Sequence, residues 1–346
     1  MSAALIDGKA FAEGLRQKIA KFADEFEAKA GRKAGLAVVL VGNDPASEVY
    51  VGRKIKGCET TGILSVEHRL PEETTQDSLL TLIARLNADP SVHGILVQVP
   101  LPKHIDTGVV LRAIAPFKDV DGFHPVNVGR LSTGTGGIVP CTPLGVTKLL
   151  DTVFDDLTGL DVVVIGKSNI VGKPIAMLLL EREATVTVTH IETKDLPGLC
   201  RKADIIIAAA GAPRLVKGDW VKEGAVIIDV GITRIKGEDG KTKLVGDVAF
   251  DEVQHARAVT PVPGGVGPMT ISCLLANTVQ AAKEQLSGKS SDGSFDDLQP
   301  VGRLSALRNA IGRGLETGPF FYSQPIRRNR TYRLRHIVNI SPVMMK

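Results

Sequence analysis

The strongest constraint on the fold of this chain is an alternation of short apolar runs with longer amphipathic stretches. GLAVVLVG (35–42) and HGILVQVP (93–100) are buried-strand runs, and residues 8–30 have the apolar spacing of a helix. The same patterns predict helices over 46–61 and 75–88 and a strand over 63–69. Strands that alternate with helices favour a parallel sheet with helices on its faces, so the fold class is α/β.

A second α/β unit begins near residue 160. DVVVIG (161–166) is a strand run, and GKSNIVGKPIAMLLL leads from it into a helix. Three more strand runs follow over 184–190, 203–211 and 224–231. Four strands with short helical crossovers are typical of a doubly wound, dinucleotide-binding domain. We expect the helical stretch over 269–285 to pack back onto the first unit.

The composition excludes several classes of protein. No apolar run approaches the roughly eighteen residues that a membrane helix needs. Aromatic residues make up 4% of the chain, with a single Trp, which disfavours a surface that stacks nucleic-acid bases. The seven histidines form no HxxxH or HxH pair and the four cysteines are widely separated, so no metal site is expected. The N-terminus MSAALIDGKAF lacks the features of a secretory signal, and the predicted location is therefore cytoplasmic.

Residues 287–346 differ in composition from the rest. They contain 10 Lys/Arg and 4 Asp/Glu, whereas the remaining chain contains 32 and 34. The segment opens with the linker-like SGKSSDGS and continues Arg-rich, without clear periodicity. A nearly neutral globular body followed by a basic, disordered tail is the resulting prediction.

The helical stretch SEVYVGRKIKGCETTG places a lysine beside its apolar stripe. Val51, Ile55 and Cys58 fall on one face of this helix. Tyr50 and Lys54 share a turn at the border of that face. From this helix alone, Lys54 either extends from the core edge into water or acts with Tyr50 on one ligand.

The turn GKSNIVGKP follows a strand and opens a helix. Its pattern of Gly166, Ser168 and Gly172 departs from the common G-x-G-x-x-G, so it is either an ordinary turn or a pyrophosphate site at a helix N-terminus. A cation at Lys167 would favour the 2′-phosphate of NADP, whereas a carboxylate at Glu192 would favour the free 2′-OH of NAD. NADP is the preferred prediction.

Three further features have a structural and a functional interpretation. TPVPGGVGPMT (260–270) is either a tight loop before a helix or a backbone that approaches a nicotinamide ring closely. KDVDGFHPVN places Asp119 and Asp121 in a turn, where one serves the turn and the other can hold a ligand's amidine-like edge. Gln98, inside the strand ILVQVP, is either a satisfied core amide or a site residue.

Six stretches together resemble the bifunctional methylenetetrahydrofolate dehydrogenase/cyclohydrolase family. They are YVGRKIKGCE, GILVQVPLP, KDVDGFHPVNVGRL, PCTPLG, GKSNIVGKP and TPVPGGVGPMT, in the family's order over about residues 1–286. The resemblance implies a folate cleft between two α/β domains. The N-terminal catalytic domain would comprise 1–140 plus 269–286, and the Rossmann-type domain 141–268. A homodimer and an NADP cofactor are also implied.

The resemblance assigns roles to individual residues. Lys54 matches the family's catalytic lysine, Gln98 the glutamine that hydrogen-bonds it, and Asp121 the aspartate that holds the pterin. Tyr50 matches the tyrosine that stacks on the aminobenzoate ring. Further implied substrate contacts are Pro263, Gly264 and Gly265, and the implied cofactor contacts are Gly166, Lys167, Ser168, Gly172, Ile191 and Ile232.

The implied reaction has two steps in one-carbon metabolism. NADP+ oxidises 5,10-methylenetetrahydrofolate to the 5,10-methenyl form, and water converts this to 10-formyltetrahydrofolate. Two alternatives stay open. One is a NAD-linked dehydrogenase without cyclohydrolase activity, and the other is a protein that binds nucleic acid or an anionic surface through its basic tail. The second alternative is disfavoured because the tail has little sustained amphipathicity.

Overall fold

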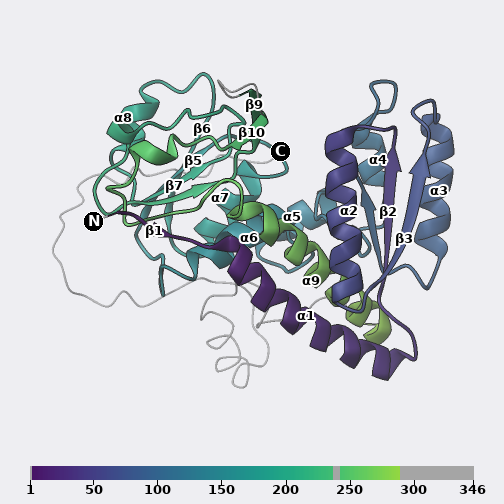
Figure 1. The fold of residues 1–346 in the computed structure, drawn as a ribbon. Coiled ribbons are helices and arrows are strands. Elements are labelled where there is room, and N and C mark those ends of the chain that lie inside the picture. Colours follow the sequence, from purple (N-terminus) through teal and green to yellow (C-terminus); the bar gives the residue numbers. More distant parts are fainter. Residues whose placement is uncertain (1, 237–241, 289–346) are drawn as a thin grey trace, which may run out of the picture. The chain divides into compact units, whose positions relative to one another are not determined.

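The computed structural model describes residues 2–236 and 242–288, all of which belong to one compact unit (Figure 1). Of the predicted basic tail, residues 289–346 lie outside the described residues, so disorder there stays a prediction. No helix in the described part combines the length and the apolar character that crossing a membrane requires.

A three-stranded parallel sheet follows the first helix of the chain. Its strand order is β3-β2-β4, and its strands are β2 (Gly35–Val41), β3 (Leu64–Leu70) and β4 (Gly94–Val97). The helices of this part are α1 (Gly8–Ala30), α2 (Pro45–Thr60), α3 (Gln76–Ala88) and α4 (Thr107–Ala113). Alternate residues of β2 contribute to two core clusters, one shared with α1 and α2 and the other with α3 and α4. Helices therefore cover both faces of this sheet, as the apolar runs predicted.

The second sheet has six parallel strands in the order β1-β11-β8-β7-β5-β6. These strands are β1 (Ala4–Leu5), β5 (Asp161–Ile165), β6 (Thr185–Thr189), β7 (Ile205–Ala208), β8 (Val226–Asp229) and β11 (Ala258–Val259). The remaining elements are α5 (Pro125–Thr133), α6 (Cys141–Leu150), α7 (Gly172–Leu180), α8 (Leu196–Cys200), β9 (Thr233–Lys236) and β10 (Thr242–Val245). The four predicted strands form the β8-β7-β5-β6 part of this sheet. The two-residue strands β1 and β11 were not predicted, because such short runs have no readable periodicity.

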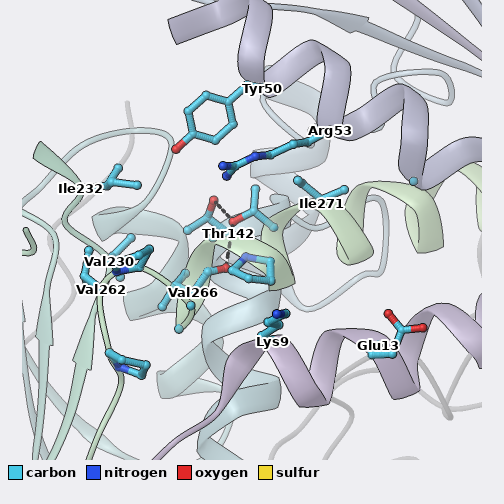
Figure 2. Close-up of a pocket in the computed structure, with 18 of the residues that line it drawn as sticks. Lys9, Glu13, Tyr50, Arg53, Thr142, Val230, Ile232, Val262, Val266 and Ile271 are labelled. Carbon is cyan, nitrogen blue, oxygen red and sulfur yellow. Dashed lines mark hydrogen bonds between the residues drawn. The ribbon is translucent and has the colours of Figure 1, made fainter. Parts of the chain in front are cut away.

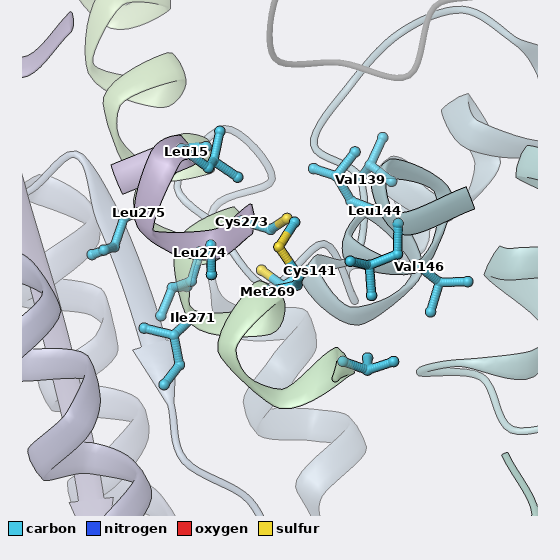
Figure 3. Packing of buried hydrophobic residues seen from close by; sticks show 14 of the residues in the cluster. Leu15, Val139, Cys141, Leu144, Val146, Met269, Ile271, Cys273, Leu274 and Leu275 are labelled. Carbon is cyan, nitrogen blue, oxygen red and sulfur yellow. The ribbon is translucent and has the colours of Figure 1, made fainter. Parts of the chain in front are cut away.

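The last described helix, α9 (Val266–Ser287), packs along α1 and α6, and it lies side by side with α1 in Figure 1. Figure 3 shows Leu15 of α1, Leu144 of α6 and Leu274 of α9 in one apolar cluster. The expectation that this helix packs back onto the first unit is confirmed. It starts three residues before the predicted position, because Pro268 is tolerated in a first turn, where its missing N–H is not needed.

The predicted strand over 93–100 is shorter than expected. β4 ends at Val97, although the Gln98 N–H still donates to Val39 O at 2.8 Å. Pro100 has no N–H for a ladder bond, which explains why a regular strand does not continue to residue 100. Gln98 therefore lies just past the carboxyl end of β4, where parallel sheets place their ligand-binding residues.

A buried histidine joins this sheet to α1. His93 Nδ1 accepts the Gly35 N–H at 2.9 Å, and its ring packs edge-on against Phe26 with 5.2 Å between centroids. Burial, with the charges of Arg32 and Lys118, lowers the pKa of His93 to about 4. In the unfolded chain the His93 side chain has its ordinary pKa of about 6.5. Below that pH the unfolded chain therefore binds more protons than the folded protein.

Acid is accordingly expected to destabilise the fold through His93. Between pH 7 and pH 5 the free energy of unfolding should fall by about 2 kcal/mol more in the wild type than in a His93→Gln variant, which cannot take up this proton. Urea titrations at the two pH values measure the difference. Parallel pH dependence in both proteins would contradict this role for His93.

Candidate active site

Lys54 lies inside the protein. It belongs to α2, whose first turn is capped by the Asp44 carboxylate, which accepts the Ser47 N–H at 2.8 Å. The lysine is 8% exposed, and its Nζ donates a hydrogen bond to Gln98 Oε1 at 3.0 Å. The interpretation in which Lys54 extends into water is therefore wrong. A buried ammonium group requires polar partners, and Gln98 is one of them.

Gln98 is held in the orientation that this contact requires. Its Nε2 donates to Val99 O at 2.6 Å, and its backbone N–H donates to Val39 O at 2.8 Å. Because the amide nitrogen is engaged with a carbonyl, Oε1 is the atom that faces Lys54 as an acceptor. The amide of Gln98 is therefore satisfied, and its role as a site residue stays a prediction.

The two aspartates of KDVDGFHPVN have different surroundings. Asp119 is fully buried, and its Oδ2 accepts from the His124 N–H at 2.7 Å and from Asn127 Nδ2 at 2.9 Å. Asp121 is half-buried. Burial raises the pKa of Asp121 to about 6, while the nearby positive charge of Lys54 opposes this rise. Asp119 thus stabilises the turn, and a ligand contact of Asp121 stays a prediction.

A buried amide from α9 holds the segment that carries Asp121. Asn277 Nδ2 donates to Val120 O and Val139 O, each at 2.9 Å, and lies 3.5 Å from Cys141 Sγ. The Cys141 thiol donates to Val120 O at 3.2 Å, and burial raises its pKa well above the usual range. Sequence reasoning missed these contacts. The available signal was an amide side chain within the apolar run LLANTV of this helix.

A cavity of about 810 Å³ receives side chains from α1, α2 and the loop before α9 (Figure 2). Five predicted site residues line it: Tyr50, Ile232, Pro263, Gly264 and Gly265. Lys54, Gln98 and Asp121 are not in its lining, but Lys54 follows Tyr50 by one helical turn. The structure therefore places these predicted site residues in two groups, which α2 connects.

The glycine-rich loop before α9 forms one wall of this cavity. Gly264 has a φ of +110°, which other residues rarely adopt, and a Cβ on Gly265 would lie 2.7 Å from Pro261 O. A Cβ on Gly8, the first residue of α1, would lie 1.9 Å from Gly265 O. The tight-loop interpretation of this segment is confirmed. The same lack of side chains leaves the backbone of this loop open to the cavity. The close approach of a nicotinamide ring to this backbone stays a prediction.

The predicted dinucleotide turn follows β5, the strand at which the order of the second sheet reverses. β5 pairs with β6 on one side and β7 on the other, which makes its carboxyl end a topological switch point. Gly166 has a φ of +120°, and a Cβ there would lie 2.2 Å from Ala209 O. A Cβ on Gly172 would lie 1.9 Å from Gly166 O. Ser168 Oγ accepts the Gly172 N–H at 3.4 Å, at the start of α7.

The other predicted cofactor residues stand at the surface near this turn. Lys167 is exposed, and Ile191 is 96% exposed. The Glu192 N–H donates to His190 Nδ1 at 3.3 Å. Lys167, Ile191 and Glu192 do not line the cavity described above. Their contribution to cofactor binding stays a prediction.

Two further buried carboxylates tie the loops at this edge together. Asp229 accepts hydrogen bonds from three backbone N–H groups at 2.9–3.0 Å, those of Gly231, Asp247 and Val248. Asp247 in turn accepts from two N–H groups of the loop after β7, at 2.7 and 2.8 Å. Burial raises the pKa of Asp229 to about 7, and this residue also lines the cavity. Sequence reasoning missed the pair, because each aspartate by itself reads as an ordinary residue of a strand end.

The described residues include no group of three or more His, Cys, Asp or Glu side chains placed to hold a metal ion. The polar groups that the structure does assemble are an ammonium–amide pair, a half-buried carboxylate and a glycine-rich cavity wall. Such an arrangement can bind a flat polar ligand and transfer protons to it.

The chain matches two domains of one family. Residues 6–121 match the tetrahydrofolate dehydrogenase/cyclohydrolase catalytic domain, and residues 140–286 match the NAD(P)-binding domain of the same family. The bifunctional protein FolD 2 of Rhizorhabdus wittichii is 78% identical over 278 residues, which cover 80% of this chain and 94% of that relative. The bifunctional protein FolD of Sphingobium chlorophenolicum is 61% identical, with 82% and 90% covered.

Solved structures are similar over the same region. The bifunctional enzyme FolD of Campylobacter jejuni is 52% identical, with a TM-score of 0.78 over 82% of this chain and 99% of that chain. The FolD of Trypanosoma brucei, complexed with NADP cofactor and inhibitor, is 40% identical, with a TM-score of 0.79 over 83% of this chain and 99% of that chain. These similarities favour the bifunctional enzyme over both alternatives, and they confirm the two-domain α/β class. The chain belongs to the tetrahydrofolate dehydrogenase/cyclohydrolase family.

Proposed function

We propose that this protein oxidises 5,10-methylenetetrahydrofolate with NADP+ and hydrolyses the methenyl product to 10-formyltetrahydrofolate in one cleft. The observation that carries this proposal is the buried Lys54–Gln98 hydrogen bond of 3.0 Å beside the half-buried Asp121. Hydride transfer by itself needs no such group, whereas ring opening of the methenyl form needs proton transfers. A lysine placed in this way favours a second, hydrolytic activity.

The substrate is bound by groups that match its chemistry. The pterin presents a 2-amino group and an N3–H, which pair with the two oxygens of a carboxylate such as Asp121. The half-buried Tyr50 ring lines the cavity one turn before Lys54 and offers a face to the aminobenzoyl ring. These two contacts would leave the reacting one-carbon unit near Lys54.

In the first step the methylene carbon loses a hydride and becomes the methenyl cation. Bound NADP+ supplies the hydride acceptor. The protein's part is to hold both reactants in contact, for which the backbone of Gly264 and Gly265 forms an open cavity wall. In the second step water adds to the amidinium carbon, the ring C–N bond breaks, and one proton is released. Lys54 is the group proposed to move protons during this step.

The dinucleotide site fits the glycine turn after β5. A Cβ at Gly166 or Gly172 would collide with the chain's own backbone, so these two glycines allow the tight turn from β5 into α7 that a pyrophosphate site of this kind requires. Lys167, exposed in the same turn, supports NADP over NAD because its charge favours a 2′-phosphate. The homodimer and the domain boundaries at residues 140 and 268 stay predictions of the resemblance, and the cytoplasmic location stays a prediction from the N-terminal sequence.

One assay on the purified full-length chain tests this function. We expect 5,10-methylenetetrahydrofolate with NADP+ to yield reduced nicotinamide while little methenyl product accumulates, and NAD+ to react more slowly. Absorbance of the reduced cofactor and of the methenyl form, recorded together, measures both steps. Accumulation of the methenyl form would instead indicate a dehydrogenase alone, and faster reaction with NAD+ would show that Glu192 outweighs Lys167.

A further inference from the structure

Asp229 and Asp247, which we call the aspartate pair, take no part in the proposed reaction. Both are buried, with exposed fractions of 4% and 0%. Burial raises the pKa of both carboxyl groups, and their like charges repel each other. An arrangement of this kind is costly for the fold, and such costs concentrate where function requires them. The groups that donate to the pair are backbone N–H groups, so the pair binds the protein's own backbone.

The aspartate pair ties together three segments at the carboxyl edge of the six-stranded sheet. Asp229, the last residue of β8, accepts from the loop that follows it and from residues 247–248. Asp247 accepts the N–H groups of Ala210 and Gly211 in the loop after β7, at 2.7 and 2.8 Å. Ligands of parallel α/β sheets bind outside this edge. The pair therefore determines how the loops next to such a ligand lie.

These loops adjoin both ends of the proposed cofactor site. The loop after β7 packs against the glycine turn, because a Cβ on Gly166 would lie 2.2 Å from Ala209 O. At the other end, the Asp229 N–H donates to Thr260 Oγ1 at 2.7 Å, directly before the glycine-rich cavity wall. Ile232, in the loop after β8, lines the cavity (Figure 2). The aspartate pair thus connects the glycine turn to the cavity wall.

We propose that Asp229 and Asp247 are positioning residues that fix the glycine turn relative to the cavity wall, so that one dinucleotide can contact both. This inference rests on the proposed function, to which it adds two residues that act through the backbone. With the pair intact, the loops are ordered before the cofactor binds. Without it, binding must order them, which lowers the affinity for the cofactor. Tyr50 and Asp121, the proposed folate contacts, belong to other elements.

The two carboxylates should differ in their tolerance of asparagine. Asp229 uses both oxygens, since Oδ1 accepts from Gly231 and Asp247. Its Oδ2 accepts from Val248. Asp247 receives both of its N–H groups on Oδ2 alone. Asparagine has one acceptor oxygen, so at position 229 it must turn its own NH2 group toward a donor. At position 247 it can keep both hydrogen bonds.

Steady-state kinetics of three variants test the inference. In Asp229→Asn and Asp247→Ala we expect the KM for NADP+ to rise about tenfold, because each loses hydrogen bonds to a charged acceptor. The KM for 5,10-methylenetetrahydrofolate and the kcat at saturating NADP+ should stay within about threefold of the wild type, because binding energy spent on ordering loops affects the cofactor alone. Asp247→Asn should restore the KM for NADP+ to within about twofold, because both hydrogen bonds persist.

Asp204→Asn is the matched control. Asp204 lies at the opposite edge of the same sheet, where it accepts the Asp161 N–H at 2.9 Å and binds Lys222 at 2.6 Å. The variant makes the same substitution at a carboxylate that also ties segments together, and it should keep the wild-type KM for NADP+. A tenfold rise in this control would overturn the inference. An unchanged KM in Asp229→Asn and Asp247→Ala, or an Asp247→Asn variant as impaired as Asp247→Ala, would do the same. If Asp229→Asn or Asp247→Ala does not fold, the other decides.

Calorimetric titration with NADPH separates this inference from the proposed function, because it needs no turnover. Weaker NADPH binding in Asp247→Ala, restored in Asp247→Asn, supports the aspartate pair even if the wild type does not turn over folate, in which case only the proposed function fails. Turnover by the wild type together with equal NADPH affinity in all variants supports the function and rejects the positioning role. Asp247 is fully buried and does not line the cavity, so a loss in its variant cannot come from a direct contact with the cofactor.

Discussion

Replacing Lys54 with methionine is expected to lower the rate of methenyl hydrolysis at least about 100-fold, which is the low end of what one acid–base group contributes. Methionine keeps much of the side-chain volume in this buried position but has no proton to transfer, and it leaves Gln98 Oε1 without its donor. Dehydrogenation should fall less than about tenfold, because it depends on positioning rather than on a proton at this site. Decay of methenyl absorbance and formation of reduced cofactor measure the two rates separately.

Lys29→Met provides the control for this experiment. Lys29 is exposed in the last turn of α1, and its replacement removes the same charge without touching the Gln98 contact. Equal losses of both activities in Lys54→Met would point to a distorted fold. Unchanged hydrolysis would exclude Lys54 from the second step and leave a dehydrogenase with a buried structural lysine.

Replacing Asp121 with asparagine is expected to lower kcat/KM for both activities by about 100-fold. The substitution keeps the shape of the side chain but converts one acceptor oxygen into a donor, which opposes the donors of the pterin edge. Hydrogen bonds to a charged group are worth about 1.5–3 kcal/mol, which corresponds to a factor of about 10 to 150. Because binding and chemistry share this contact, both steps should be affected, in contrast to Lys54→Met.

Asp121 also predicts how activity depends on pH. The carboxylate that accepts from the pterin is the ionised form, which predominates above the pKa of about 6. The kcat/KM of the wild type should therefore decrease as pH falls through about 6, approaching a tenfold loss per pH unit below it. Asp121→Asn should lack this dependence. A matched variant at Asp119 is not suitable, because that carboxylate holds His124 and Asn127. An acid limb that persists in Asp121→Asn would assign it to another group.

Much of the fold could be predicted because its signals are local. The apolar spacing of α1 and the β-branched run of β5 each reflect side chains within a few residues of one another, and the structure has both elements within a residue of the predicted bounds. The errors occur where local signals end. β1 is a two-residue strand that forms only because β11 lies beside it. β4 ends before the predicted residue, because the end of a strand depends on which backbone N–H groups find partners in the neighbouring strand.

Parts of the candidate site were less accessible from the sequence. The pattern of the helix that contains Lys54 did not predict whether this lysine is buried, because a residue at the border of an apolar stripe is buried only if another element covers it. Asn277 bonds to Val120 O across 157 positions in the chain, and no spacing rule connects such residues.

The α/β class, the glycine turn after a buried strand and the six motifs of the family could be identified without the structure, since these depend on residues that are near each other in the chain. The packing of distant segments was needed to establish that Lys54 is buried against Gln98, that Asp119 serves the turn while Asp121 lies within electrostatic range of Lys54, and that cations of α1 and α2 line one cavity. The physical reason is that burial and electrostatic pairing are properties of packed neighbours, and parallel strands bring together chain segments whose separation leaves no periodic trace.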